Sequence, residues 1–302
     1  MPEQRILEQA VRLPTEGAVT GWAACRLHGA NFFDGMLPDG RTEVPVPLVV
    51  GPTRRLRVDA HVTISHDRMD PDDRAIRYGI PCTTVRRALF DAMRVAVDLR
   101  EAVVAMDMMA AAELTSVRRM RDYCTSHARW NGVPQVRAAL DLASDDSRSP
   151  NETRMRLVWV LDAELPVPAV NRPVYDLDGR LLGIPDLLDV AAGVVGEYDG
   201  EEHRRARRHA RDVAREDRLR RHGLEVFRVT GPDLPQRGLL VERMHAARSR
   251  AKWLPSGERA WTTEDPASDG PAPTLDDLLD HQEWLADVYA AYERRPGAVR
   301  TG

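Results

Sequence analysis

Residues 148–235 constrain the fold more than any other part of the chain, because their apolar pattern changes several times between a helical period and a strand period. The segment opens with Ser149, a residue type that caps helices, followed by Pro150 at the first helical position. Apolar residues at helical spacing continue through Leu161. We therefore expect this block to begin with an amphipathic helix.

A run of short strands is expected after that helix. The pair Asp178-Gly179 is typical of a hairpin turn between two of them. Strands are predicted over residues 170–177, 181–188, 194–199 and 224–230, with an arginine-rich helix over residues 202–222 before the last strand. The order α-β-β-β-α-β predicts a mixed α/β fold of the α+β kind.

Three carboxylates are distributed over this block so that the expected topology brings them together. Glu152 belongs to the first helix, Asp186 to the second strand and Glu197 to the third. Neighbours on paired strands lie within about 5 Å, so Asp186 and Glu197 can share an ion. Carboxylate oxygens suit Mg²⁺ or Mn²⁺. Such an ion polarises a phosphodiester and generates hydroxide from bound water, which makes phosphodiester hydrolysis the expected chemistry.

The motifs around these acids resemble a known family. The run Pro185-Asp186, then Gly196-Glu197-Tyr198-Asp199-Gly200 and His203, is similar to the signature of Vsr-like proteins of the PD-(D/E)XK, or restriction-endonuclease-like, superfamily. The downstream positions that match the same pattern are Asp212, Arg215, Leu219, Gly223 and Arg228. The resemblance covers residues 149–232 and implies a restriction-endonuclease-like α-β-β-β-α-β core.

The resemblance also implies roles for individual residues. Asp186 and Glu197 would hold the metal, with Glu152 as a further ligand or a group that positions water. His203 would act as general base or polarise water. The arginines expected to contact nucleic acid are Arg211, Arg215, Arg218 and Arg228.

One position departs from the family pattern. The motif has a lysine two residues after the second strand acid, where this chain has Asp199. The only lysine in the sequence is Lys252, far from the motif. Asp199 is left with two roles, a further metal ligand or a cap for the turn into the next helix. The Vsr-like branch often lacks the lysine, so the expectation of activity stands.

Each of these residues also has a purely structural interpretation. Glu152 stands where the third residue of a capping box would stand, and Asp186 follows a proline as many turn aspartates do. An arginine-rich helix is usually a solvated face. We expect Asp189 to be a surface residue with no part in the site.

The N-terminal half carries a second resemblance. The pattern Ala23-Ala24-x-x-Leu27-His28-Gly29 and the run 83–91 are similar to AbiEi-type antitoxin-like regulators of type IV toxin–antitoxin systems. Those proteins begin with a DNA-binding winged helix, for which residues 1–18 are too few. The alternative interpretation of this half is a mostly helical packing domain that positions the nuclease-type block.

The chain is expected to consist of three consecutive parts, namely residues 1–147, the nuclease-type domain at 148–250, and a linker with a C-terminal helix at 251–302. Residues 253–273 are rich in Pro, Gly, Ser and acids, as linkers are. A helix over residues 274–295 presents one apolar face that could bind the body of the protein or a protein partner; its members are Leu275, Leu278, Leu279, Leu285, Tyr289 and Tyr292.

Composition limits the remaining possibilities. The net charge of −4 excludes a uniformly basic nucleic-acid-coating protein, and the three cysteines, Cys25, Cys82 and Cys124, have no metal-site spacing. The most apolar stretch, residues 102–114, is interrupted by Asp107 and Glu113 and is too short to span a membrane. A cytoplasmic protein without a membrane partner is expected.

The sequence thus predicts a Mg²⁺- or Mn²⁺-dependent endonuclease that hydrolyses DNA. The alternative is a non-catalytic, antitoxin-like transcriptional regulator whose nuclease-type fold only binds nucleic acid or a partner protein. The oligomeric state, and the choice between DNA and RNA, stay open.

Overall fold

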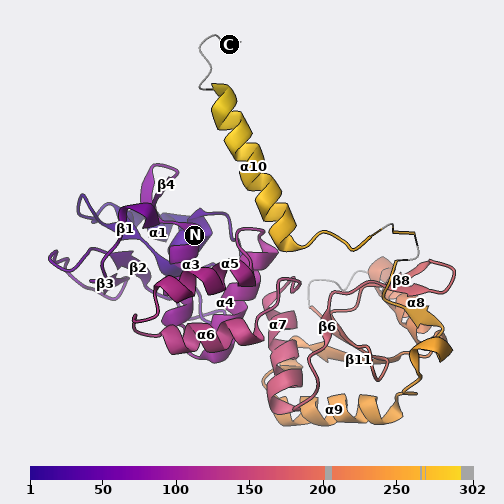
Figure 1. The fold of residues 1–302 in the computed structure, drawn as a ribbon. Coiled ribbons are helices and arrows are strands. Elements are labelled where there is room, and N and C mark those ends of the chain that lie inside the picture. The colour runs from indigo at the N-terminus through magenta and orange to yellow at the C-terminus, as the bar shows by residue number, and fades with distance from the viewer. Residues whose placement is uncertain (201–205, 266, 269, 294–302) are drawn as a thin grey trace. The chain divides into compact units, whose positions relative to one another are not determined.

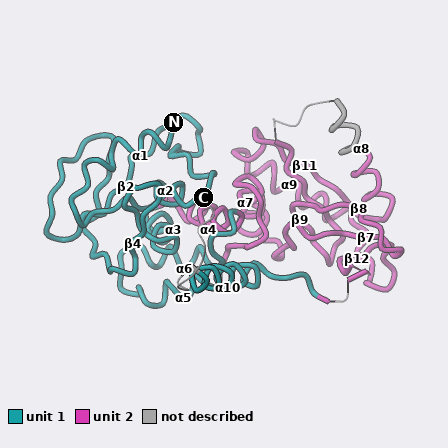
Figure 2. Tube along the Cα trace, turned by 90° about the horizontal axis from the view of Figure 1, so that it is seen from above, with its two compact units in different colours: residues 1–95, 112–140, 271–302 teal, residues 96–111, 141–270 magenta. Residues whose placement is uncertain are grey.

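The protein, seen in a computed structural model that describes residues 1–200, 206–265, 267–268 and 270–293, has a mixed α/β fold (Figure 1). Two compact units divide the chain. Unit 1 comprises residues 1–95, 112–140 and 271–302, and unit 2 comprises residues 96–111 and 141–270 (Figure 2). Both units are discontinuous in sequence, whereas the sequence-based division has three consecutive parts.

Unit 1 contains a five-stranded mixed sheet with the order β3-β2-β1-β5-β4. The alternating stretches at residues 43–50 and 56–65 contain β2 and β3, which pair in parallel. The sheet consists of β1 (Ala18–Val19), β2 (Val46–Val49), β3 (Val62–Ser65), β4 (Arg74–Arg77) and β5 (Ile80–Thr83).

Several helices accompany this sheet. One of them, α5, is capped by Ser116, whose hydroxyl accepts the backbone N–H of Arg119 at 3.2 Å. The helices are α1 (Pro2–Ala10), α2 (Gly21–Leu27), α3 (Val85–Arg94), α5 (Val117–Ser126), α6 (Val133–Leu142) and α10 (Leu275–Glu293).

The C-terminal helix α10 joins unit 1 through its first turns. Asp276 accepts hydrogen bonds from the Ser116 hydroxyl at 2.5 Å and from Arg118 Nε at 2.7 Å. Leu279 is buried, whereas Tyr289 and Tyr292 farther along the helix are exposed. Only part of the expected apolar face is therefore covered, and a partner for the remainder stays a prediction.

Unit 2 contains the block with the α-β-β-β-α-β pattern. A four-stranded sheet has the order β11-β10-β9-β6, and a three-stranded sheet has the order β12-β7-β8. The strands are β6 (Ala169–Val170), β7 (Val174–Asp176), β8 (Leu181–Gly183), β9 (Leu187–Asp189), β10 (Val194–Asp199), β11 (Glu225–Thr230) and β12 (Trp261–Thr262). The helices are α4 (Leu99–Ala111), α7 (Pro150–Leu157), which continues as a π-helix (Val158–Asp162), α8 (Ala206–Arg221) and α9 (Arg237–Arg250).

The first two expected strands of this block each break into two, which corrects the sequence-based prediction. The same register holds at Ala169, which faces Leu188, and at Val174, which faces Gly183, and it shifts by one residue at Tyr175, which faces Leu181. Between these pairs, Asn171 takes a left-handed backbone conformation with φ of 45°, and prolines at 173 and 185 lack the N–H of a regular ladder. The two halves of the hairpin therefore belong to different sheets.

Strand β10 lies inside unit 2 with both faces covered, which explains why consecutive residues at its start are apolar. Val194 packs in the cluster that contains Trp159 of the π-helix and Met244 of α9. Val195 packs on the opposite face, with Leu219 of α8 and Trp261 of β12. Trp159 also stacks on Phe227 of the parallel neighbour β11, with ring centroids 5.9 Å apart. The β10 side chains therefore alternate between two cores.

One buried carboxylate, that of Asp107, connects helix α4 to the rest of unit 2. Asp107 has no exposed surface and accepts the Thr153 hydroxyl at 2.7 Å, Arg156 Nη2 at 2.6 Å and the backbone N–H of Ser144 at 2.8 Å. Thr153 and Arg156 lie on α7, in the helical turn that follows Glu152. This network fixes α7, and with it the position of Glu152.

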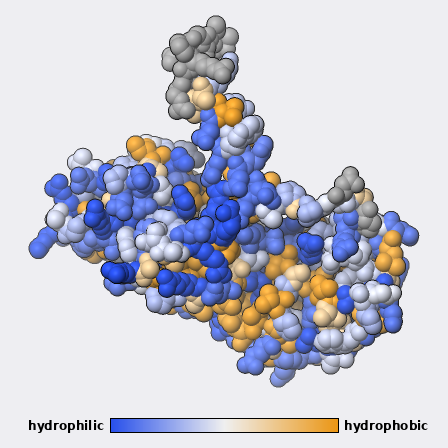
Figure 3. All heavy atoms as spheres, in the orientation of Figure 1, coloured by the Kyte–Doolittle hydropathy of each residue, from blue (hydrophilic) through white to orange (hydrophobic). Residues whose placement is uncertain are grey.

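On the visible faces of the molecule, hydrophobic residues gather mainly over unit 2, while unit 1 is covered mostly by hydrophilic residues (Figure 3). Leu161, Val167 and Leu239 are among the exposed apolar side chains of unit 2. Among the described helices, none combines the length and the apolar character needed to cross a membrane.

Candidate active site

The structure places Glu197 on a buried face of β10. Its side chain points to the same face as Val195, the face that α8 covers, because alternate residues of a strand share a face. Glu197 is only 6% exposed. An ionised carboxylate at such a place needs compensating groups. One of them is Arg215 of α8, whose Nη2 donates to Glu197 Oε2.

Asp186 lies directly before β9 and opposite Glu197. The β9–β10 register pairs Leu187 with Gly196, and one further step along both strands brings Asp186 across from Glu197. Asp186 Oδ2 accepts the backbone N–H of Tyr198 at 2.6 Å. These two acids are therefore neighbours on adjacent strands, as the hairpin spacing predicted.

Burial raises the pKa of Asp186 to about 6. The Tyr198 N–H opposes the rise, the negative charge of Glu152 adds to it, and the positive charges of Arg215 and Arg148 oppose it. Asn171 bridges the two acidic residues, because its side chain donates to Glu152 and its backbone N–H donates to the Asp186 carbonyl at 3.2 Å. Two like charges in partly buried surroundings form a place that favours a cation.

Glu152 is oriented by the start of α7. Ser149 caps this helix by accepting the Glu152 N–H at 3.3 Å. The Glu152 carboxylate accepts the backbone N–H of Arg148 and Nδ2 of Asn171, both at 3.0 Å. The carboxylate thus reaches back one residue beyond the N-cap, and it also bonds to the irregular segment of the hairpin. A structural role at the helix terminus is confirmed, and a role in catalysis stays a prediction.

Asp199 and Arg228 lie at the end of the β10–β11 pair. Asp199 is exposed, and Arg228 Nη1 lies 3.8 Å from its Oδ2. Arg228 also donates through Nε to Glu216 at 2.9 Å. Arg218 of α8 contacts the Leu182 carbonyl at 3.4 Å. The motif's lysine position is therefore occupied by an acid beside an arginine.

Arg215 lies close against the hairpin. A Cβ added to Gly183 of β8 would lie 3.2 Å from Arg215 Cδ, so the arginine stem passes directly over this glycine. Its guanidinium group then reaches Glu197. The arginine is thus positioned both by packing and by charge. His203 lies outside the described residues, and Arg211 lies on α8 with its side chain outside the described part.

Residues that the sequence did not single out complete the surroundings of the acids. Asn171 is 8% exposed and donates to the carbonyl of Asp146 at 2.9 Å as well as to Glu152. Its signal in the sequence was an asparagine at the second position of an expected strand, since asparagine tolerates the left-handed conformation. The hydroxyl of Tyr198 accepts Asn151 Nδ2 at 2.7 Å.

Asp189, expected at the surface, is instead 5% exposed. It accepts Arg248 Nε of α9 at 2.8 Å and the backbone N–H of Ala192 at 3.1 Å. The expectation of surface exposure was wrong because the partner that allows its burial comes from a helix far along the chain. Its role is to fix the β9–β10 turn and α9.

In its chemistry, the donor set fits a hard divalent cation, because Glu152, Asp186 and Glu197 all offer carboxylate oxygens. Burial raises the pKa of Asp186, which indicates that its negative charge is poorly compensated in the protein. In its arrangement the set is incomplete. Within the part of the chain that the structure describes, no three His, Cys, Asp or Glu side chains converge closely enough to hold a metal ion. Among the described groups, the Arg215 guanidinium is a cation that Glu197 binds.

No protein-family model matches the chain, and neither a curated protein nor a solved structure resembles it significantly. The fold and the site together define a mixed α/β protein whose central strand carries a buried carboxylate, with a second carboxylate beside it and an arginine above.

Asp186 gives the site a measurable pH signature. Its pKa is about 6 in the folded chain and roughly 4 in an unfolded one, so ionisation costs the folded state about 2–3 kcal/mol. This cost is absent below about pH 4, grows up to about pH 6 and is constant above. Asp186→Asn removes it, while the amide oxygen still accepts the Tyr198 N–H. We expect the free energy of unfolding of the variant, relative to wild type, to increase from pH 4.5 to about pH 6 and to keep that advantage up to pH 7.5.

Thermal unfolding in EDTA, at a series of pH values, measures this effect. EDTA keeps any bound metal from altering the ionisation of the carboxyl group. A difference in Tm between the two proteins that does not change with pH would contradict the raised pKa.

Proposed function

We propose that unit 2 is a metal-dependent endonuclease of the restriction-endonuclease-like, PD-(D/E)XK kind that hydrolyses DNA phosphodiester bonds. The observation that supports this proposal is the placement of Asp186 and Glu197 across from each other on β9 and β10, with the charge of Glu152 acting on Asp186. This is the set of acids that the motifs predicted.

In the proposed site, Asp186 and Glu197 hold Mg²⁺ or Mn²⁺, with Asp199 at the exposed end of the same strand as a further ligand. The ion, when bound, polarises the scissile phosphate and lowers the pKa of a water molecule. Glu152, held by Arg148 and Asn171, orients the attacking water. His203 takes up its proton.

The arginines of α8 and β11 give the site its affinity for a phosphate backbone. Arg215 provides a positive charge beside Glu197, which is the charge that a lysine would provide at position 199. Arg211, Arg218 and Arg228 extend the basic surface along the DNA. In this proposal, the contact between Arg215 and Glu197 belongs to the protein without ligands. When metal and substrate bind, Glu197 contacts the metal and Arg215 contacts the substrate phosphate.

A second function is favoured by the same ion pair. If Arg215 permanently neutralises Glu197, the site needs no metal, and the protein is a non-catalytic, antitoxin-like regulator that binds DNA or a partner protein. Metal binding separates the two proposals. Only in the nuclease must Glu197 release Arg215 and bind a metal ion instead.

The test is cleavage of supercoiled plasmid and of labelled single- and double-stranded DNA in Mg²⁺ or Mn²⁺, with EDTA controls. We expect cutting that depends on metal, and a loss of at least about 100-fold in Asp186→Ala and in Glu197→Ala, since the ion contributes several kcal/mol to the transition state. Asp217→Ala, which alters an exposed carboxylate on α8, is the matched control and should cut like wild type.

Calorimetric titration of the same proteins with Mn²⁺ completes the test. Binding by wild type that is lost in Asp186→Ala supports the nuclease. Neither cutting nor metal binding by wild type would overturn it in favour of the regulator. Equal cutting by all variants would identify a contaminating nuclease and overturn the site assignment.

A further inference from the structure

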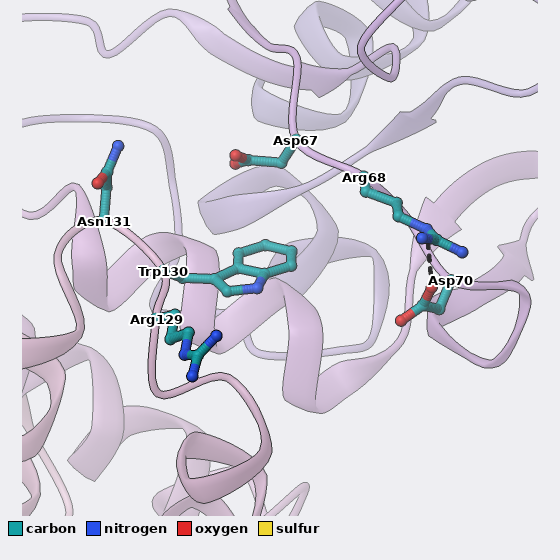
Figure 4. Close-up of a pocket in the computed structure, with 6 residues that line it drawn as sticks. All are labelled: Asp67, Arg68, Asp70, Arg129, Trp130 and Asn131. Carbon is teal, nitrogen blue, oxygen red and sulfur yellow. Dashed lines mark ion pairs between the residues drawn. The ribbon is translucent and has the colours of Figure 1, made fainter.

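Unit 1 contains a hollow that has no part in the carboxylate site. It surrounds the indole of Trp130 and has a volume of about 580 Å³ (Figure 4). Small-molecule sites typically measure roughly 300–1,000 Å³, so the hollow is large enough for a ligand. One wall comes from the segment after β3 and the other from the loop between α5 and α6; the lining residues are Asp67, Arg68, Asp70, Arg129, Trp130 and Asn131.

The indole of Trp130 packs against four side chains of unit 1, those of Arg87, Phe90, Arg94 and His127. The guanidinium carbon of Arg87 lies 4.2 Å from the ring centroid, and that of Arg94 lies 5.5 Å from it. Phe90 and His127 meet the ring edge-on, with centroids 5.9 and 5.1 Å away. Arg87 is itself fully buried. The indole is therefore a fixed flat surface, and a ligand that stacks on it would not have to order it first.

The rim of the hollow offers donors without partners. Arg129 and Asn131, on either side of Trp130 in the sequence, are exposed, and their side chains make no hydrogen bond or ion pair with the described residues. Arg68 is also exposed, and its nearest acid is Asp70 at 3.4 Å. An exposed pair of this kind is weak and opens easily for a ligand.

The segment after β3 also offers acceptors, on either side of Arg68 in the sequence. Asp67 accepts the Ser65 hydroxyl at 2.6 Å and is bound by Arg94. Burial alone would raise the pKa of Asp67, but the Ser65 hydroxyl and the Arg94 charge outweigh it and lower the pKa. The hollow thus combines an aromatic surface, free guanidinium and amide groups, and ionised carboxylates.

We propose that this hollow binds one nucleotide, with its base stacked on Trp130 and its phosphate held by Arg129 and Arg68. Bases stack on aromatic side chains irrespective of their identity, and arginine binds phosphate through paired donors. Asp67 or Asp70 can accept from the exocyclic amino group of an adenine, cytosine or guanine base. A cationic ligand is disfavoured, because the guanidinium groups of Arg87 and Arg94 already act on the indole.

A free mononucleotide and an unstacked nucleotide of a single strand present the same chemistry. A base inside a duplex does not, since both of its faces are covered by neighbours. The hollow shares no residue with the carboxylate site. Nucleotide binding should therefore persist in Asp186→Ala, and failure of the nuclease proposal leaves this one intact.

The experiment titrates the full chain by calorimetry with purine and pyrimidine nucleoside monophosphates, and by fluorescence anisotropy with short labelled single-stranded and duplex oligonucleotides. We expect Arg129→Gln and Trp130→Leu to weaken binding by about tenfold or more, as loss of a charged hydrogen bond or of one stacked base does. Trp130→Phe keeps an aromatic surface and should retain most of the affinity. Arg55→Gln alters an exposed arginine of the same unit and is the matched control.

Binding of mononucleotides identifies a small-molecule site, and binding of single strands alone identifies a strand-binding site; either result supports the proposal. No binding of either by wild type at millimolar concentration would overturn it. Equal affinity of wild type, Arg129→Gln and Trp130→Leu would also overturn it, because the ligand would then bind elsewhere. Circular dichroism verifies that Trp130→Leu is folded, and Arg129→Gln gives an independent result on an exposed side chain.

Discussion

Alanine in place of Asp107 is expected to lower the free energy of unfolding of unit 2 by about 3–5 kcal/mol. The carboxylate is fully buried and holds the Thr153 hydroxyl, the Arg156 guanidinium and the Ser144 N–H. Its removal leaves the nearly buried charge of Arg156 without its carboxylate. Breaking a buried pair costs far more than the pair itself contributes, since the remaining charge stays out of water.

Urea-dependent hydrogen exchange of peptides from α4 and α7 measures this loss where it occurs. Asp107→Asn keeps a hydrogen-bond acceptor and should lose less stability than the alanine variant. Asp217→Ala, at an exposed acid of the same unit, should change stability by less than about 0.5 kcal/mol. An alanine variant as stable as that control would show that the Asp107 network contributes nothing.

The second large effect is expected in unit 1, where Arg87→Met should cost about 3–5 kcal/mol. Arg87 is fully buried, donates to Asp91 at 2.9 Å and lies 3.3 Å from Asp73. Methionine fills a similar volume without the charge, so two poorly exposed carboxylates would lose their shared cation. The Trp130 ring would lose the group stacked 4.2 Å from its centroid.

Arg86→Met is the matched control, because Arg86 is the exposed neighbour on the same helix. We expect no more than about 0.5 kcal/mol from it. Urea unfolding followed by hydrogen exchange of α3 peptides distinguishes the two variants. If Arg87→Met unfolded at the same urea concentration as Arg86→Met, the buried network would have to be regarded as neutral, as some ion pairs are when replaced by apolar groups.

Features that depend on neighbouring residues were predictable from the sequence. Ser149 and Pro150 marked the start of α7, and the mixed α/β fold class follows from the alternation of patterns. The apolar run of β10, interrupted by Glu197, identified a strand with a charge that needed an explanation. The neighbouring positions of Asp186 and Glu197 follow from one hairpin, which is also a local feature.

Features that depend on distant partners were not predictable. Asp107 looked like an interruption of an apolar helix, because its partners at Ser144, Thr153 and Arg156 come later in the chain. The third strand of the small sheet is β12, which pairs with β7 from within a segment predicted to be a linker. The contact of Arg215 with Glu197 depends on how α8 packs, so pattern alone could not show it.

The discontinuity of the two units has a consequence for synthesis of the chain on the ribosome. Helix α4 is made early, but the groups that hold Asp107 emerge only after residue 156 has been translated. Unit 1 has to wait longer still, since Asp276, which binds Ser116 and Arg118, is translated well after residue 156. Neither unit can therefore complete its folding before its late segment arrives, and the nascent chain must keep the apolar residues of α4 from aggregating in the meantime.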